Sequence, residues 1–238
     1  MLPKIDVPIY DLKLISLNKK IRFRPFTVKE EKLLLMATES QDAESVLNTI
    51  KQVVNNCVLD DVKVDNLPIF DLEYLFLNLR ARSISEIVTL KYKCNNDVED
   101  KKCGNVVQFD MNLLDIKPEK EKEHSNKIEI TDKLGIVMKY PNFALVEKYK
   151  DTADVNSIIN LIIDCIDYIY DEEGMYYSKD TPREEIEAFI DSLQTKELEK
   201  LKNFFDTMPK VKKNLNFKCN KCGHEEDIDV EGIQSFFG

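Results

Sequence analysis

The chain lacks long apolar runs and has few glycines and histidines, and these shortages exclude several classes of protein. Its strongest apolar stretch, residues 158–169, is interrupted by Asn160, Asp164 and Asp167, so we expect no membrane span. Only six glycines and two histidines occur among 238 residues, with neither a phosphate-binding glycine loop nor a nucleophile elbow. We therefore expect no enzymatic activity and no small-molecule substrate.

Positive charge is also in short supply. The formal net charge is −10 and the isoelectric point is near 4.9, which argues against a broad nucleic-acid surface because phosphate binding needs clustered lysine and arginine. The remaining composition, 43% hydrophobic and 33% charged, is typical of a soluble globular protein of one or two domains. The first residues lack the apolar segment of a secretory signal, so we expect synthesis in a cytoplasm.

Four of the six cysteines form two pairs with nearly identical surroundings. When residues 96–101 are removed, the segment from Lys93 to Gly104 has the same sequence, K-C-N-K-C-G, as the segment from Lys218 to Gly223. Two such knuckles supply four thiolates, which is the ligand set of a structural zinc, and the glycine after each pair lets the backbone turn toward the sulfurs. The predicted zinc ligands are Cys94, Cys103, Cys219 and Cys222.

Other roles of these cysteines are a disulfide and a redox motif. Disulfides are less favoured, because Cys57 and Cys165 lie alone in apolar helical patterns and indicate a reducing compartment. A redox C-x-x-C motif would open a helix beside a βαβ unit, whereas this pair lies in a hairpin context. The first pair has eight residues between its cysteines, more than is usual for a zinc knuckle. His224 is interpreted as a solvated hairpin residue, since four cysteines already complete the ligand set.

The pattern predicts an α+β fold in which helical segments alternate with short antiparallel β-hairpins and a four-cysteine zinc-ribbon-like element joins two halves. The stretch from Lys117 to His124 is highly charged and suggests an exposed connector. We therefore expect an N-terminal half (1–116), a connector (117–126) and a C-terminal half (127–238).

Local signals place the individual elements. In the first half they predict a hairpin turning at Asn18 and a helix after a Thr27–Glu30 capping box. A second helix is predicted to start near Asp42, and a third follows Pro68 with Asp71 as its cap. Paired strands are predicted at 85–93 and 106–111. In the second half they predict strands at 128–130 and 136–138, a helix over 154–170, helices capped at Thr181 and Thr195, and strands at 215–219 and 228–230.

Two features suggest partner-binding surfaces. Four of the five arginines form the pairs Arg22/Arg24 and Arg80/Arg82, and arginine is enriched where proteins meet. An equally acceptable interpretation is that they bridge acidic residues of this chain. The segment 232–238 contains Phe236 and Phe237, which either fold back onto the ribbon or enter a partner.

Whole segments of the chain are similar to one known family. They are Phe23–Phe26, Val28–Leu35, Asp71–Ser83, His124–Lys127, Gly135–Pro141 and the C-x-x-C-G segment with the later Phe-Phe. Together they resemble the baseplate hub proteins of T4-like contractile-tailed bacteriophages, especially those of marine phages.

The resemblance implies a structural subunit of the tail baseplate hub in the virion, made in the host cytoplasm, which binds other baseplate proteins and has no enzymatic activity. The cysteine pairs match the family's metal positions, and the long first pair is the departure. One alternative is an assembly chaperone of the hub that is absent from the mature virion. Another, from a different class, is a zinc-ribbon regulator that binds nucleic acid, which the negative charge disfavours.

Overall fold

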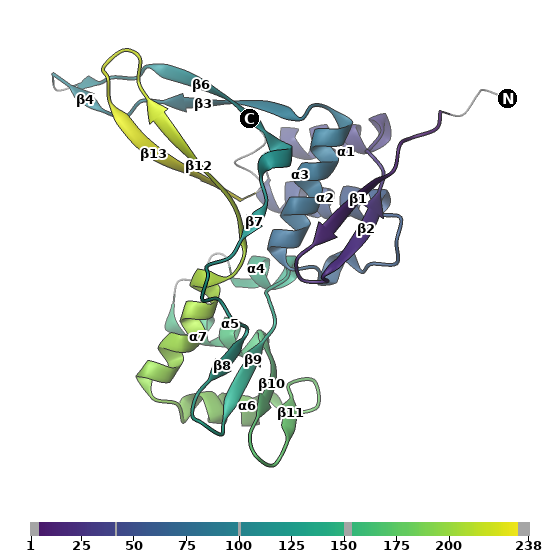
Figure 1. Ribbon diagram of the computed structural model, residues 1–238, viewed down its shortest axis with the longest axis vertical. Coiled ribbons are helices and arrows are strands. Elements are labelled where there is room, and N and C mark those ends of the chain that lie inside the picture. The colour runs from purple at the N-terminus through teal and green to yellow at the C-terminus, as the bar shows by residue number, and fades with distance from the viewer. Residues whose placement is uncertain (1–4, 41, 100, 150–153, 233–238) are drawn as a thin grey trace. The chain divides into compact units, whose positions relative to one another are not determined.

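The computed structural model describes residues 5–40, 42–99, 101–149 and 154–232, and it has the expected α+β class (Figure 1). The α-helices are α1 (Val28–Glu39), α2 (Ala43–Cys57), α3 (Ile69–Ser83), α4 (Phe143–Tyr149), α5 (Val155–Asp164), α6 (Arg183–Asp191) and α7 (Thr195–Thr207). The strands are β1 (Tyr10–Leu14), β2 (Lys19–Phe23), β3 (Ile87–Lys93), β4 (Asp97–Val98), β5 (Lys101–Lys102), β6 (Val106–Asn112), β7 (Pro118–Glu119), β8 (Lys127–Glu129), β9 (Gly135–Met138), β10 (Ile166–Tyr170), β11 (Met175–Tyr177), β12 (Lys210–Lys218) and β13 (Glu225–Glu231). Short 3-10 helices cover Val64–Asn66 and Leu113–Asp115.

The chain divides into two compact units. The first contains residues 1–64, 70–119 and 210–238, and the second contains residues 65–69 and 120–209. The chain thus leaves the first unit inside the stretch that we expected to be a connector. Residues 210–238 group with the N-terminal segments because β12 and β13 carry the second cysteine pair to the first. The boundaries 1–116, 117–126 and 127–238 stay a prediction.

The first unit begins with a hairpin packed beside three helices. β1 and β2 pair antiparallel, and Asn18 turns the chain with a positive φ of 45°, a conformation that asparagine tolerates better than most residues. Leu14, Ile21 and Phe23 alternate inward and are buried. The predicted capping box is present at the start of α1, where Thr27 N donates to the Glu30 carboxylate.

Asp71 has a different role from the predicted helix cap. It lies inside the first turn of α3, fully buried, and its carboxylate accepts from the backbone N–H groups of Ile15 and Ser16 and from the Ser16 hydroxyl. The carboxylate therefore holds the turn between β1 and β2, and burial raises its pKa. Sequence spacing alone cannot show this, because the partners lie 55 and 56 residues away.

Two β-hairpins complete the first unit. β3 pairs with β6 over its whole length, and β12 pairs with β13, so both predicted ribbons are present. β12 also pairs with β7 through Lys210 and Val211, which ties the start of the last hairpin to the strand at Pro118 and Glu119. Figure 1 shows the two hairpins converging at their turns.

The second unit packs helices against a four-stranded antiparallel sheet of order β11-β10-β9-β8. Its core includes Ile136, Ile162, Ile166, Leu201 and Phe204, contributed by β9, β10 and two helices. The predicted helix over 154–170 is only partly correct, since α5 ends at Asp164. Residues 166–170 form β10, because β-branched and aromatic side chains suit the strand that β9 and β11 flank.

Three further positions differ from the predictions. His124, expected in an exposed connector, is buried in the second unit, where its ring nitrogens bond to Thr207 Oγ1 and Tyr140 Oη, both at 2.9 Å. Pro182 rather than Thr181 precedes α6, since the Thr181 hydroxyl donates to Tyr177 O. Gln194 rather than Thr195 caps α7, in a capping box with Glu197.

Candidate metal centre

The two cysteine knuckles have the same backbone construction. In the first, Gly104 N donates to Cys94 O at 3.0 Å, and Cys94 N donates to Asn105 O at 2.8 Å. In the second, Gly223 N donates to Cys219 O at 2.9 Å, and Cys219 N donates to His224 O at 2.8 Å. Gly104 and Gly223 have positive φ values of 64° and 74°, which glycine adopts without steric cost. The duplicated sequence therefore encodes a duplicated turn.

Described residues of the insertion in the first knuckle take part in a strand pair of their own. β4 and β5 pair as a miniature hairpin in which Asp97 lies opposite Lys102, and the two side chains form an ion pair at 2.9 Å. The backbone N–H of Cys103 donates a hydrogen bond to Asn96 O at 2.8 Å. The insertion thus leaves and rejoins the knuckle between its two cysteines, and the long spacing does not alter the turn at Gly104.

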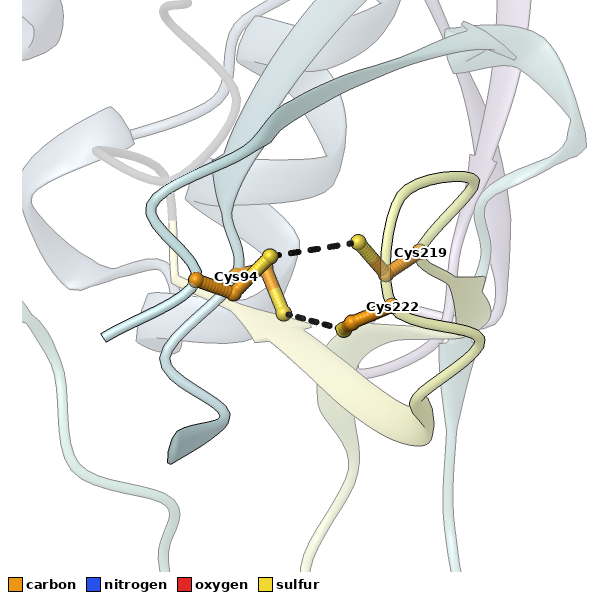
Figure 2. Close-up of side chains that lie close together, drawn as sticks. Cys94, Cys219 and Cys222 are labelled. Atoms are coloured by element: carbon orange, nitrogen blue, oxygen red, sulfur yellow. Dashed lines mark hydrogen bonds between the residues drawn. The ribbon is translucent and has the colours of Figure 1, made fainter. Parts of the chain in front are cut away.

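The four predicted ligands lie together, with all their Sγ atoms within 4.8 Å of one another. Cys94 Sγ is 3.7 Å from Cys222 Sγ, and Cys103 Sγ is 3.8 Å from Cys219 Sγ. Figure 2 shows Cys219 and Cys222 of the second knuckle facing Cys94 of the first. A tetrahedron with zinc–sulfur bonds of about 2.3 Å has edges of about 3.8 Å. The cluster therefore fits one tetrahedral ion, whereas a disulfide needs sulfurs about 2.05 Å apart.

Backbone and asparagine amides surround the sulfurs. Asn105 Nδ2 donates to Cys219 Sγ at 3.5 Å, and Asn96 Nδ2 donates to Cys222 Sγ at 3.7 Å. Each asparagine belongs to one knuckle and contacts a sulfur of the other. Such donors stabilise thiolate charge and orient the ligands. Sequence reasoning missed both residues, although each lies two positions after a predicted ligand.

Burial and hydrogen bonding act in opposite directions on these thiols. Burial raises the pKa of Cys94 to about 12. By contrast, backbone N–H groups led by that of Cys222 lower the pKa of Cys219 to about 6. A cation placed among the four sulfurs would favour the thiolate form of all of them.

An aromatic cluster packs against the cysteines. Phe217 of β12 is fully buried beside Cys94 and Cys219, and its ring centroid lies 4.8 Å from that of Tyr92 and 6.0 Å from that of Phe109. Tyr92 and Phe109 belong to the other hairpin. The sulfur cluster therefore sits at the end of a small apolar core shared by both hairpins.

The arginine pairs mostly bridge acidic residues of this chain. Arg22 bonds to Asp60 at 2.8 Å, Arg24 bonds to the buried Glu30 at 3.0 Å, and Arg82 bonds to Glu86 at 2.5 Å. Arg82 also lies over the Tyr10 ring at 4.8 Å. Arg80 is different, because its Nη1 is buried without a hydrogen-bond partner.

The partner-binding roles of these four arginines stay predictions. Phe236 and Phe237, the other predicted contacts, lie outside the residues that the structure describes. Within the described ranges, no helix combines the length and hydropathy needed to cross a membrane.

Comparison with known protein families identifies a match to almost the whole chain. The family described as T4 bacteriophage base plate protein matches residues 7–238, almost the whole chain. No curated protein and no solved structure matches the chain.

Proposed function

Because the chain belongs to the T4 bacteriophage base plate protein family, we propose that it is a structural subunit of the baseplate hub, held in shape by a structural zinc ion. The match over residues 7–238 carries the assignment to the tail baseplate, and hence to the virion. The hub is favoured over other parts of the baseplate by the resembling segments, chiefly Asp71–Ser83 and Gly135–Pro141. Its partners are then other baseplate proteins.

The zinc supplies structure rather than chemistry. Four thiolates fill a tetrahedral shell, so no coordination position remains for water or substrate. Cys94 and Cys103 come from one hairpin and Cys219 and Cys222 from the other, so the ion clamps two ribbons whose aromatic core is small. Zinc is preferred over other divalent ions because four soft thiolates in a tetrahedron match it well. A role without catalysis fits both this closed shell and the structural family.

The binding surfaces belong to the same proposal. Arg22 is the strongest arginine candidate, because its side chain is 58% exposed even while bonded to Asp60. Arg24 is less suitable, since it neutralises the buried Glu30. Phe236 and Phe237 remain candidates from sequence alone.

Quantitative proteomics of purified phage particles tests the proposed function. A hub subunit is recovered in fixed stoichiometry with the other baseplate proteins, and isolated baseplates retain it. Recovery from infected cells together with hub precursors, but not from finished particles, would instead establish the assembly chaperone. Salt-sensitive retention on DNA, without recovery in either fraction, would favour the nucleic-acid regulator.

The metal is tested on the purified chain. We expect one zinc per chain by inductively coupled plasma mass spectrometry, and tetrathiolate absorption bands after replacement with cobalt. A metal content near zero after purification with zinc present would refute the structural ion.

A further inference from the structure

A groove of about 700 Å³ lies in the first unit, and none of the four cysteines lines it. Both cysteine-bearing hairpins and the C-terminal end of α3 line it. Its apolar wall includes Val88 and Leu90 of β3, Leu215 of β12, and Ile228 and Val230 of β13. The groove shares Tyr92, Phe109 and Ile228 with the apolar core beside the cysteines.

One side of the groove is an open strand edge of β3. Leu113 N donates to Glu86 O and Cys94 N donates to Asn105 O, and both pairs continue the β3–β6 register. Bonded and non-bonded pairs alternate in an antiparallel ladder. Thr89 and Lys91 therefore direct their backbone N–H and C=O groups away from β6, and both residues line the groove.

The other side includes an open edge of β13. Cys219 N donates to His224 O, which continues the β12–β13 register. By the same alternation, Ile228 and Val230 bond to β12, whereas Asp229 directs its backbone groups away from it. Among the described strands, β3 pairs only with β6 and β13 only with β12. Two unpaired strand edges thus border one apolar groove.

Arg80 adds a positive charge to this wall. The other four arginines each have a carboxylate partner within the described chain, namely Asp60, Glu30, Glu86 and Asp164. No such partner of Arg80 is found in the described ranges, and its Nη1 is buried and unbonded. A guanidinium that lines the groove without a carboxylate partner favours an incoming anion, with which it can form charge-assisted hydrogen bonds.

We propose that this groove binds an extended segment of a neighbouring baseplate protein, which adds a strand to the edge of β3 and directs an Asp or Glu side chain to Arg80. The inference rests on the proposed function, since it names where a baseplate partner binds. The open edge supplies main-chain bonds, the apolar wall holds alternate side chains, and the guanidinium selects a carboxylate. Residues 233–238 of this chain contain no Asp or Glu side chain, and the cross-linking experiment below distinguishes their entry into the groove from that of a partner.

Photo-cross-linking during assembly tests the proposal. The full chain carries p-benzoylphenylalanine in place of Lys91, within the groove, or in place of Met175 as a control. Met175 is 61% exposed and lies on β11, an edge strand of the second unit. We expect position 91, and not position 175, to cross-link to one segment of another baseplate protein that contains Asp or Glu.

Matched variants then test the two recognition elements, with the cross-linked segment synthesised as a peptide probe. Thr89→Pro removes an N–H that points into the groove without removing a β3–β6 bond. Thr89→Ala is its control, because it also loses the hydroxyl that donates to Asp110 but keeps the N–H. Thr89→Pro should weaken peptide binding at least tenfold relative to Thr89→Ala. Unchanged zinc content verifies that the hairpins remain folded.

Arg80→Gln should weaken binding about 10- to 100-fold, the range expected for a charge-assisted hydrogen bond, and Arg80→Lys should weaken it less. Replacing the peptide's acidic residue by its amide should cost about as much in the wild type and almost nothing in Arg80→Gln. Equal losses in both proteins would overturn the assignment of Arg80.

The failure of this inference is distinguishable from failure of the proposed function. If the chain enters particles but position 91 cross-links only within the chain, including to residues 233–238, or to nothing, the groove proposal is wrong and the hub subunit stands. If the chain does not enter particles or hub precursors, the proposed function fails first and the groove proposal falls with it.

Discussion

Replacing Cys222 by serine removes one of the four sulfurs and should release the clamp between the hairpins. Cys94 and Cys222 are 128 residues apart in sequence, but the β7–β12 ladder already closes most of that loop. The remaining loop, residues 94–118 and 211–222, contains 37 residues. Closing such a loop contributes about 4 kcal/mol in the chain-entropy description of a cross-link. This is the expected loss of local stability in Cys222→Ser.

Hydrogen exchange measures this loss where it occurs. Amides of β3, β6, β12 and β13 should exchange about 10³-fold faster in the variant, since each 1.4 kcal/mol corresponds to a factor of ten. Amides of the second unit should not change. A chelator should reproduce the effect in the wild type and add little in Cys222→Ser.

Cys165→Ser is the matched control for this experiment. Cys165 is fully buried in the core of the second unit and is not part of the sulfur cluster. The same chemical change should therefore destabilise the second unit while zinc content and hairpin protection stay at wild-type values. Equal hairpin protection in Cys222→Ser and wild type, with zinc bound in the wild type, would refute the clamp.

Other perturbations address the rest of the fold. Arg24→Ala should lower the free energy of unfolding by about 2 kcal/mol, because it leaves the buried Glu30 without its cation. Arg22→Ala should instead weaken partner assembly more than folding. Thermal melts measure the stability loss and particle incorporation measures assembly, and equal stability losses in the two variants would contradict this expectation. Burial opposes ionisation of Glu30, but bonds from Arg24 and Thr27 outweigh it and lower its pKa to about 2. The stability that Glu30 adds over Glu30→Gln should therefore be complete above about pH 5 and disappear as pH falls toward 2, as urea titrations across that range would show; a pH-independent difference would count against it. Gly135→Ala should cost about 1–3 kcal/mol in the second unit, because the new Cβ would lie 2.2 Å from the Tyr170 hydroxyl oxygen, and near-UV circular dichroism should report the displaced ring.

Local signals in the sequence predicted much of the fold and the clustering of the four cysteines. The repeated K-C-N-K-C-G sequence identified the sulfur cluster, because a knuckle is a local turn whose ligands and glycine lie within a few residues. The turn at Asn18 and the capping box at Thr27 were likewise predicted correctly, since each depends on neighbouring residues. Each signal is local. The meeting of the two knuckles is a distant contact, and it was predicted because a tetrahedral ion needs four ligands and each knuckle supplies two.

Features that depend on tertiary contacts were not predictable. The apolar residues 158–169 suit a buried helix or a buried strand, and only pairing with β9 and β11 shows that β10 starts at Ile166. Asp71 suited a helix cap by position, but its partners come from a distant turn. The buried, unbonded Nη1 atom of Arg80 becomes evident only from the folded arrangement of the described residues.

The first unit is discontinuous in sequence, and this fixes an order of events during synthesis. Residues 120–209 leave the ribosome before the last hairpin exists, so the second unit can fold while the polypeptide is still being made. The N-terminal segments must wait until residue 222 has emerged before all four sulfurs can capture an ion. Uptake of the proposed metal would therefore be a late maturation step, and truncated products that end before the final ribbon would be left without it.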